Sequence, residues 1–326
     1  MKGLELAERY YFAYGRPMLE EKFPDLVGKV AAGLVGQGSE CLGFDDAFSM
    51  DHDYGPSFCL WLTKEDYEKY GCRLSEEYDR LPSEFEGLKG RIVSAGGQGR
   101  VGVHMISDFY YGLIGMEKAP DSLMEWMEIP ESRLGLAVNG KVFEDPLGEF
   151  SAIREKLLSF YPEDVRLKKI AARAAVMAQS GQYNYARAMK RGEYVAAQLS
   201  LSEFIKTTIS MVYLLNRKYT PFYKWMHRGM KDLPILSEIG DILNLLVEMG
   251  SQASAWEGTK TEDYLYLLNM NDQKVIIIEA VCNLVLQELV AQGFTQGEDN
   301  FLEHHVAKLM EGIADPYIRS LQIMEG

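Results

Sequence analysis

The hydrophobic positions divide the chain into two halves with different periodicities. In the first half, short apolar runs alternate with glycine turns, a pattern typical of strands joined to helices. The pattern predicts an opening helix over residues 4–23 that is interrupted near Gly15-Arg16-Pro17, and strands at 30–35 and 51–62. It also predicts a charged helix at 64–70, a polar helix at 75–81, and a β-hairpin formed by 91–94 and 100–106.

From residue 150 onward, apolar residues recur at i, i+3 and i+4, as on the buried face of a helix. Helices are predicted at 149–160, 162–179, 183–191, 201–216, 221–231, 236–249, 273–292 and 301–313. We therefore predict an α/β or α+β domain over residues 1–148, followed by a helical domain over 149–326. The boundary is expected near Asp145-Pro146-Leu147-Gly148.

The charge is unevenly distributed along the chain. The 326 residues carry a net charge of −14, which disfavours binding to nucleic acid or to an anionic membrane. Residues 154–231, however, hold 15 Lys+Arg against 5 Asp+Glu, a local net charge of +10. This segment is either an anion site, with nucleotide phosphates as the obvious ligand, or a solvated face that pairs with the acidic flanks.

Several features indicate a cytoplasmic protein without a membrane span. The 4 cysteines show no C-x-x-C spacing, which indicates reduced thiols. Charged residues occupy the N-terminal positions where a signal peptide needs an apolar core. The most apolar stretch, 275–291, is interrupted by polar side chains such as Glu279 and Glu288, so it predicts a buried core helix.

The motif that carries chemistry begins at a Gly38-Ser39 turn after the first predicted strand. The second strand begins with Asp51-His52-Asp53, and residues i and i+2 of a strand face the same way. Two such carboxylates repel each other unless a cation lies between them, and Mg²⁺ or Mn²⁺ suits that place. Turn amides, the Ser39 hydroxyl and a helix beginning after Ser39 could together hold a phosphate. The alternative is an ordinary glycine turn followed by a solvated acidic strand end.

The longer string, G-S-E-x-L-G-F-D-D-x-x-S-x-D-H-D-Y-G-P, resembles the DUF4037 branch of the polymerase-β-like nucleotidyltransferase superfamily. Residues 214–225, Leu-Leu-Asn-Arg-Lys-Tyr-Thr-Pro-Phe-Tyr-Lys-Trp, are similar to the helical segment of that branch, which belongs with the helix bundles of kanamycin and lincosamide nucleotidyltransferases. The resemblance implies an α+β chain. Its N-terminal half would have the nucleotidyltransferase fold, a mixed sheet with flanking helices, and its C-terminal half would be an all-α helical bundle like that of kanamycin nucleotidyltransferase.

The resemblance also implies residue roles. Gly38 and Ser39 would hold the triphosphate, and Asp51 and Asp53 would bind Mg²⁺. The family often places a third carboxylate on a later strand, where this chain has Gly102 and His104. His104 could serve as the base instead, because its ordinary pKa near 6.5 suits proton abstraction. It could equally be an ordinary strand histidine, with Glu193 or Glu203 of the helical half supplying the base.

Cations of the helical half complete the candidate site. In two-domain nucleotidyltransferases a basic residue commonly reaches the triphosphate from the helical domain, and Lys224 is the first choice here, with Tyr223 beside it to stack on a base or sugar. Arg187 and Lys190, one helical turn apart, are the second choice. For each of these cations, a solvated surface position is the alternative.

Two functional hypotheses follow. The first is a Mg²⁺-dependent nucleotidyltransferase that moves a nucleoside monophosphate, with AMP from ATP as the expected case, to a hydroxyl of a small molecule or a protein. The second is a nucleotide-binding or regulatory protein of impaired catalysis, such as one component of a toxin–antitoxin pair. The absence of an evident third carboxylate on the later strand motivates the second hypothesis.

Overall fold

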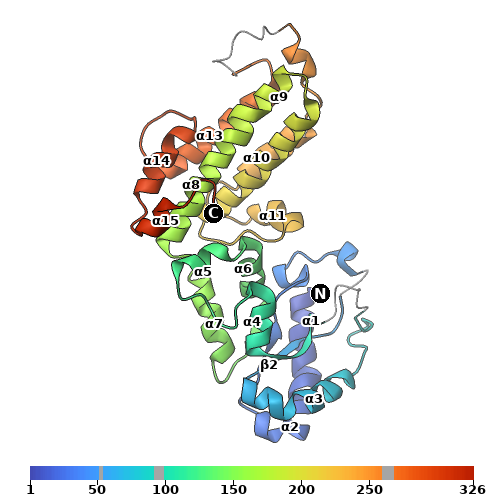
Figure 1. Ribbon diagram of the computed structural model, residues 1–326. Coiled ribbons are helices and arrows are strands. Elements are labelled where there is room, and N and C mark those ends of the chain that lie inside the picture. Colours follow the sequence, from blue (N-terminus) through green and yellow to red (C-terminus); the bar gives the residue numbers. More distant parts are fainter. Residues whose placement is uncertain (51–53, 92–98, 259–267) are drawn as a thin grey trace. The chain divides into compact units, whose positions relative to one another are not determined.

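The computed structural model describes residues 1–50, 54–91, 99–258 and 268–326, and it divides into two compact units. The first unit comprises Met1–Asp121 with Ile129–Phe160, and the second comprises Ser122–Glu128 with Tyr161–Gly326. The first unit contains a mixed sheet and the second is built of helices (Figure 1), so the predicted α+β class is confirmed. The predicted domain division after residue 148 stays a prediction, and the first compact unit extends to Phe160.

The first unit places short strands among helices. In chain order its described elements are α1 (Gly3–Tyr10), η1 (Tyr11–Gly15), α2 (Arg16–Lys22), η2 (Pro24–Leu26), β1 (Ala31–Leu34), η3 (Glu40–Leu42), η4 (Ala47–Met50), β2 (Cys59–Leu62), α3 (Lys64–Asp79), β3 (Gly102–Met105), α4 (Ile106–Ile114), α6 (Glu131–Val138), β4 (Lys141–Glu144) and α7 (Glu149–Leu158).

Two helices differ from their predicted form. The opening helix is not interrupted, because a π-helical turn, η1, joins α1 directly to α2, and its wider coil accommodates Pro17 without a break. The charged helix predicted at 64–70 and the polar helix predicted at 75–81 are one helix, α3. Thr63 caps its N-terminus by accepting a hydrogen bond from the Asp66 amide.

The sheet has the strand order β3-β2-β1-β4. β1 pairs antiparallel with β2 and with β4, whereas β2 and β3 are parallel, with Trp61 opposite His104. β3 therefore has β2 as its described partner, and residues 92–94 of the predicted hairpin lie outside the described residues. β4 was not predicted, because its four residues, Lys-Val-Phe-Glu, show no clear apolar alternation. In the structure Lys141 is exposed and the other three residues are half-buried.

Helices cover both faces of the sheet. Leu60 and Leu62 of β2 lie in a buried cluster with residues of α1, α2 and α3, including Tyr10, Leu19 and Leu74. On the opposite face, Trp61 stacks on Phe150 of α7 with ring centroids 3.9 Å apart, and it meets Phe109 of α4 at 5.2 Å. Because alternate residues of β2 supply the two cores, the sheet is a buried middle layer between helices.

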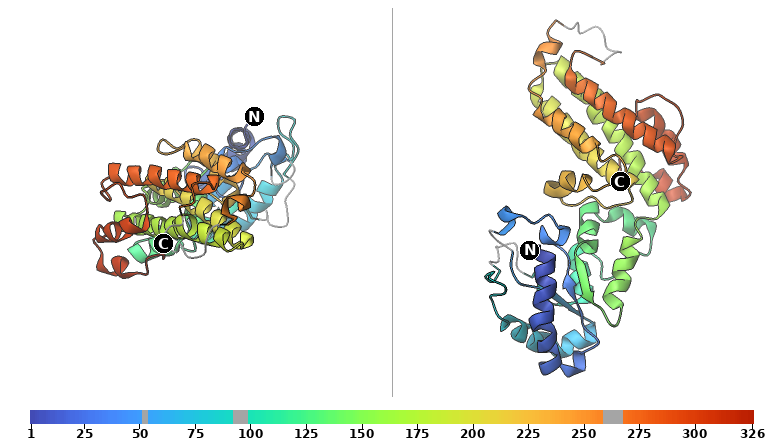
Figure 2. Two further views of the ribbon diagram at one scale, coloured as in Figure 1. Left: turned by 90° about the horizontal axis from the view of Figure 1, so that it is seen from above. Right: turned by 180° about the vertical axis from the view of Figure 1, so that it is seen from behind.

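The second unit is a helical bundle in which α8, α10 and α13 run side by side (Figures 1 and 2). Its described elements are α5 (Leu123–Glu128), α8 (Glu163–Met177), η5 (Ala178–Tyr185), α9 (Ala186–Lys190), α10 (Tyr194–Leu215), α11 (Tyr223–Met230), α12 (Ile239–Glu248), η6 (Ala253–Trp256), α13 (Gln273–Ala291), α14 (Glu303–Glu311) and α15 (Pro316–Ser320). The predicted helix at 183–191 is the end of a continuous rod in which the π-helical η5 joins α8 to α9.

The apolar stretch at 275–291 forms the buried core helix that its sequence predicts. Val275, Ile278, Val285 and Leu289 of α13 are all buried. Within the described residues, none of the helices has the length and apolar character needed to cross a membrane. All four cysteines are free.

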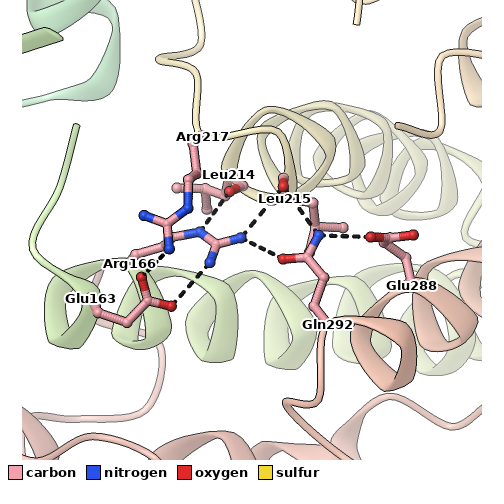
Figure 3. A network of polar contacts seen from close by, with 7 residues as sticks. All are labelled: Glu163, Arg166, Leu214, Leu215, Arg217, Glu288 and Gln292. Atoms are coloured by element: carbon pink, nitrogen blue, oxygen red, sulfur yellow. Dashed lines mark hydrogen bonds and ion pairs between the residues drawn. The ribbon is translucent and has the colours of Figure 1, made fainter. Parts of the chain in front are cut away.

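A buried arginine ties three helices of the second unit together (Figure 3). Arg166 of α8 is 2% exposed and donates to the Leu214 carbonyl at 3.0 Å and to the Leu215 carbonyl at 3.4 Å, both in the last turn of α10. It also donates to Gln292, just after α13, at 2.6 Å, and to Glu163 at 3.0 Å. The guanidinium thus places a positive charge on carbonyls at a helix C-terminus, where the helix dipole is negative.

Part of the basic segment therefore has an internal role. Besides Arg166, Lys168 of α8 is buried, and its ammonium donates to the carbonyls of Gln322 at 2.9 Å and Ile323 at 3.1 Å, and to that of Glu325. These side chains are not on a solvated face, and their charged groups bind carbonyls of the chain itself. The excess positive charge of 154–231 consequently overstates the surface charge of the segment.

We expect Arg166→Met to lower the free energy of unfolding by about 3 kcal/mol, because it leaves the Leu214 carbonyl and Gln292 without their charged donor. The matched control is Arg217→Met. Arg217 also donates to Glu163, at 2.6 Å, but from the surface, so its loss should cost less than about 1 kcal/mol. Urea unfolding measures both variants, and equal losses would contradict a special role for the buried guanidinium.

Candidate functional site

The loop that follows β1 contains the predicted glycine turn. Gly38 has a φ of +130°, a conformation that residues with a side chain rarely adopt. A Cβ atom on Gly38 would also lie 2.5 Å from the Oε2 atom of Glu40, which shows how closely that carboxylate packs against the loop. Glycine is therefore required at position 38, both for this backbone conformation and to leave room for the Glu40 carboxylate.

The loop offers unpaired backbone donors. The amides of Gln37, Gly38 and Ser39 donate to no acceptor in the described part of the chain. The Ser39 carbonyl, in contrast, accepts from the amides of Leu42 and Phe44 at 3.2 and 2.9 Å. The helix expected after Ser39 is only the three-residue turn η3, too short for a helix dipole, so the loop amides themselves are the means of binding an anion.

A side chain from another segment fixes the start of this loop. The Gly36 amide donates to Oδ1 of Asn139 at 2.8 Å, and Nδ2 of Asn139 donates back to the Gly36 carbonyl at 2.7 Å. The next residue, Gly140, donates its amide to the Cys41 carbonyl at 2.8 Å. A Cβ atom on Gly140 would lie 2.0 Å from the Leu34 carbonyl oxygen, so only glycine allows this approach.

The Asn139–Gly140 turn was not among the predicted site residues. The sequence carried a signal for it, since an Asn-Gly pair before a short run containing Val142 and Phe143 is a strong turn indicator. That signal indicates a turn before a strand. It does not indicate that the turn lies against the loop of Gly36.

Asp45 anchors the chain after the loop. It is 4% exposed, and its carboxylate accepts a hydrogen bond from the Gly3 amide at 3.0 Å, at the start of α1. Lys2 lies 3.7 Å from the other carboxylate oxygen. These contacts give Asp45 a structural role. Its neighbour Asp46 accepts from the Phe48 amide at 3.0 Å and so caps the turn η4.

A cavity of about 300 Å³ lies beside the loop. Gly36 and Gln37 of the loop form part of its wall, and Tyr67 of α3 and Arg100 also line it. β3 and α4 contribute further residues, including His104, Asp108 and Phe109. The cavity thus brings the loop together with the strand on which the sequence placed a candidate base. Its size suits a small organic molecule.

His104 is a weak base in this environment. Its ring lies 5.6 Å from that of Phe109, and its Nε2 atom is buried without a hydrogen-bond partner among the described residues. Burial lowers the pKa of His104 from 6.5 to about 4. A general base works best with a pKa near the operating pH, so the structure favours a packing role for this imidazole.

Asp108 is the carboxylate that the sequence reasoning missed. It is exposed in the first turn of α4 and lines the same cavity as His104. The sequence predicted this acid on the strand itself or in the helical half, at Glu193 or Glu203, whereas Asp108 lies just beyond the end of β3. An acidic residue within one helical turn after the predicted strand is the sequence feature that could have identified Asp108.

The two predicted metal ligands, Asp51 and Asp53, lie outside the described residues. Elsewhere in the described chain, no group of three or more His, Cys, Asp and Glu side chains could hold a metal ion. The expectation of Mg²⁺ therefore stays a prediction from the sequence.

The candidates of the helical unit form two separate groups. Arg187 donates to the Tyr183 hydroxyl and lies 4.5 Å from the centre of its ring, whereas Lys224 lies 5.2 Å from the Trp225 ring. Tyr223 is 71% exposed at the start of α11. Helix α10 has 22 residues and spans about 33 Å between α9 and α11. Arg187 and Lys190 therefore cannot share one triphosphate with Tyr223 and Lys224.

Comparison with known proteins gives a partial family match. Residues 126–226 match a family model described as a domain of unknown function, DUF4037. This supports the predicted resemblance in its DUF4037 part. The matched segment contains Asn139 and the helical candidates but not the Gly38–Asp53 motif.

A solved structure from Exiguobacterium sibiricum 255-15, a nucleotidyltransferase-like protein, matches with a TM-score of 0.36 and 10% sequence identity. The match covers 94% of this chain and 91% of that one. No curated protein matches the chain. A similarity this distant does not indicate a function for this chain.

We expect Asn139→Ala to lower the free energy of unfolding by about 2 kcal/mol and to speed hydrogen exchange at the Gly36 amide, which loses its acceptor. Hydrogen exchange followed by mass spectrometry measures the effect on the loop. The control is Asn271→Ala at an exposed position. Unchanged exchange at the Gly36 amide would show that the two Asn139 hydrogen bonds do not hold the loop.

The low pKa of His104 predicts a pH dependence of stability. Well above pH 6.5 the imidazole is neutral in both the folded and the unfolded chain. As the pH falls from 6.5 towards 4, the unfolded chain takes up the proton first, so the folded state loses at most about 3 kcal/mol. His104→Phe should remove that loss. Denaturant unfolding of both proteins between pH 4 and 7 measures it, and parallel curves would contradict the assignment.

Proposed function

We propose that this protein is a Mg²⁺-dependent nucleotidyltransferase that binds a nucleoside triphosphate, with ATP as the expected donor. The observation that carries the proposal is the loop after β1, where three successive amides, those of Gln37, Gly38 and Ser39, donate to no acceptor in the described residues. Such a row of backbone donors suits the oxygens of a polyphosphate. The sequence adds Asp51 and Asp53 at the spacing at which the resembling superfamily binds its metal.

The reaction would transfer a nucleoside monophosphate to a hydroxyl group of a small molecule or of a protein. The acceptor oxygen attacks the α-phosphorus, the bond from that phosphorus to the bridging oxygen breaks, and pyrophosphate leaves. The loop amides would hold the β- and γ-phosphates in place for this step. A metal bound by Asp51 and Asp53 would neutralise charge on the phosphates.

The acceptor proton needs a base, and Asp108 is the better candidate. Its carboxylate is exposed at the cavity, whereas the His104 imidazole, with a pKa of about 4, takes up protons poorly at neutral pH. The cavity of about 300 Å³ beside the loop is the place proposed for the acceptor. The net charge of −14 disfavours nucleic acid as that acceptor.

The low basicity of His104 also favours the second hypothesis, a nucleotide-binding regulatory protein without transfer activity. The two are distinguished by the product. A transferase releases pyrophosphate when a hydroxyl acceptor is supplied, whereas a sensor binds the nucleotide and releases none. Loss of pyrophosphate release in Asp108→Asn with nucleotide binding retained would assign Asp108 as the base.

We expect Mg²⁺-ATP at about 100 times its Kd to raise the melting temperature of the protein by roughly 5 °C. Asp51→Asn combined with Asp53→Asn should abolish this shift, because the metal loses its ligands. The control is Asp79→Asn, which removes an exposed carboxylate at the end of α3 and should leave the shift unchanged. Thermal unfolding with each of the four nucleoside triphosphates measures it. No shift with any of them, in Mg²⁺ or Mn²⁺, would overturn the proposed function.

A further inference from the structure

A buried carboxylate lies directly against the glycine loop. Glu40 follows Ser39 and is 4% exposed, and its carboxylate packs on Gly38 while its Cβ lies against Gly3 at the start of α1. Burial raises the pKa of Glu40, and nearby Arg91 opposes that rise. An anionic group in this position is unexpected beside a loop proposed to bind phosphates, because like charges repel.

Arg91 neutralises this carboxylate. Its Nη2 atom lies 3.4 Å from Oε1 of Glu40, and the two side chains are 6% and 5% exposed. Nη1 of Arg91 donates to the Ser57 hydroxyl at 3.1 Å. Neither Nη2 of Arg91 nor Oε1 of Glu40 makes a hydrogen bond within the described structure, so charge rather than directed hydrogen bonding joins the two groups.

Two other charged groups act on Glu40. Arg100 lowers the pKa of Glu40, and Asp45 raises it, but the effects of both are smaller than that of Arg91. The balance of charge beside the loop therefore depends mainly on the Glu40–Arg91 pair. Because both side chains are buried, water screens their charges poorly, and a change in either reaches the loop with little attenuation.

We propose that the Glu40–Arg91 ion pair sets the electrostatic potential of the loop and thereby positions the polyphosphate, with Arg91 cancelling a carboxylate that would otherwise repel it. The Glu40 side chain packs against Gly38 and holds it in its left-handed conformation. Arg91 neutralises that side chain and so makes it compatible with an anionic ligand. This inference rests on the proposed function. Both residues are positioning residues, since neither buried group needs to touch the ligand.

The proposal predicts effects of opposite sign for the two halves of the pair. Glu40→Gln keeps the shape of the side chain but leaves the Arg91 charge uncancelled, so it should tighten binding of inorganic tripolyphosphate and of Mg²⁺-ATP by about tenfold. Arg91→Met leaves the carboxylate uncancelled and should weaken binding by a similar factor. The double variant restores neutrality and should bind about as the wild type does. Titration calorimetry gives the dissociation constants.

The control is Glu20→Gln, which changes the net charge equally but removes an exposed carboxylate of α2 that pairs with Arg16. It should alter the dissociation constants less than about twofold at physiological salt. A purely structural pair would weaken binding in both single variants. A folded Glu40→Gln protein that binds no more tightly than the wild type would overturn the inference.

Thermal unfolding of each variant separates loss of fold from loss of binding. Where one single variant does not fold, the other single variant and the double variant still give the sign of the effect. If the wild-type protein binds neither tripolyphosphate nor any nucleoside triphosphate, the proposed function fails, and the inference fails with it. If the wild type binds but the effects share one sign, only the inference fails.

Discussion

The two hydrogen bonds between the Asn139 side chain and the Gly36 backbone determine where the loop after β1 lies. They replace one step of strand pairing, since Asn139 offers Gly36 both a donor and an acceptor, as a neighbouring strand would. With the start of the loop fixed in this way, β4 pairs with β1 immediately after the Asn139–Gly140 turn. The conformation of the next residues, including the free amides up to Ser39, depends on this clamp.

Other contacts hold the loop from its far side. Asp45 accepts from the first turn of α1, and Glu40 lies between Gly38 and Gly3. Buried carboxylates are costly unless charge or hydrogen bonds compensate them, and here a backbone amide and Arg91 do so. The acidic residues after Gly38 are thus part of the support of the loop.

In the helical unit, buried cations are compensated by polar groups of the chain, as the buried carboxylates are in the first unit. Arg166 donates to the terminal carbonyls of α10, and Lys168 donates to carbonyls near the end of the chain. Both cations belong to the basic segment that, in the sequence alone, is a candidate anion site. The structure separates these internal cations from Lys224, which lies beside Trp225 next to the exposed Tyr223 and stays a candidate for contact with a nucleotide.

The sequence by itself determined the features that depend on neighbours along the chain. Periodicity predicted the strand at β1, the glycine turn after it, the buried helix α13 and the helical character of the second half, because each follows from local spacing of apolar residues and from glycine. It also provided the Gly38–Ser39 and Asp51–Asp53 spacing, although the two aspartates lie outside the described residues. Only the tertiary structure decided that Glu40 and Asp45 are buried, that Asn139 binds Gly36 from 103 positions away, and that His104 has a pKa of about 4. Those properties depend on groups far apart in sequence, and local patterns do not record which distant segments meet.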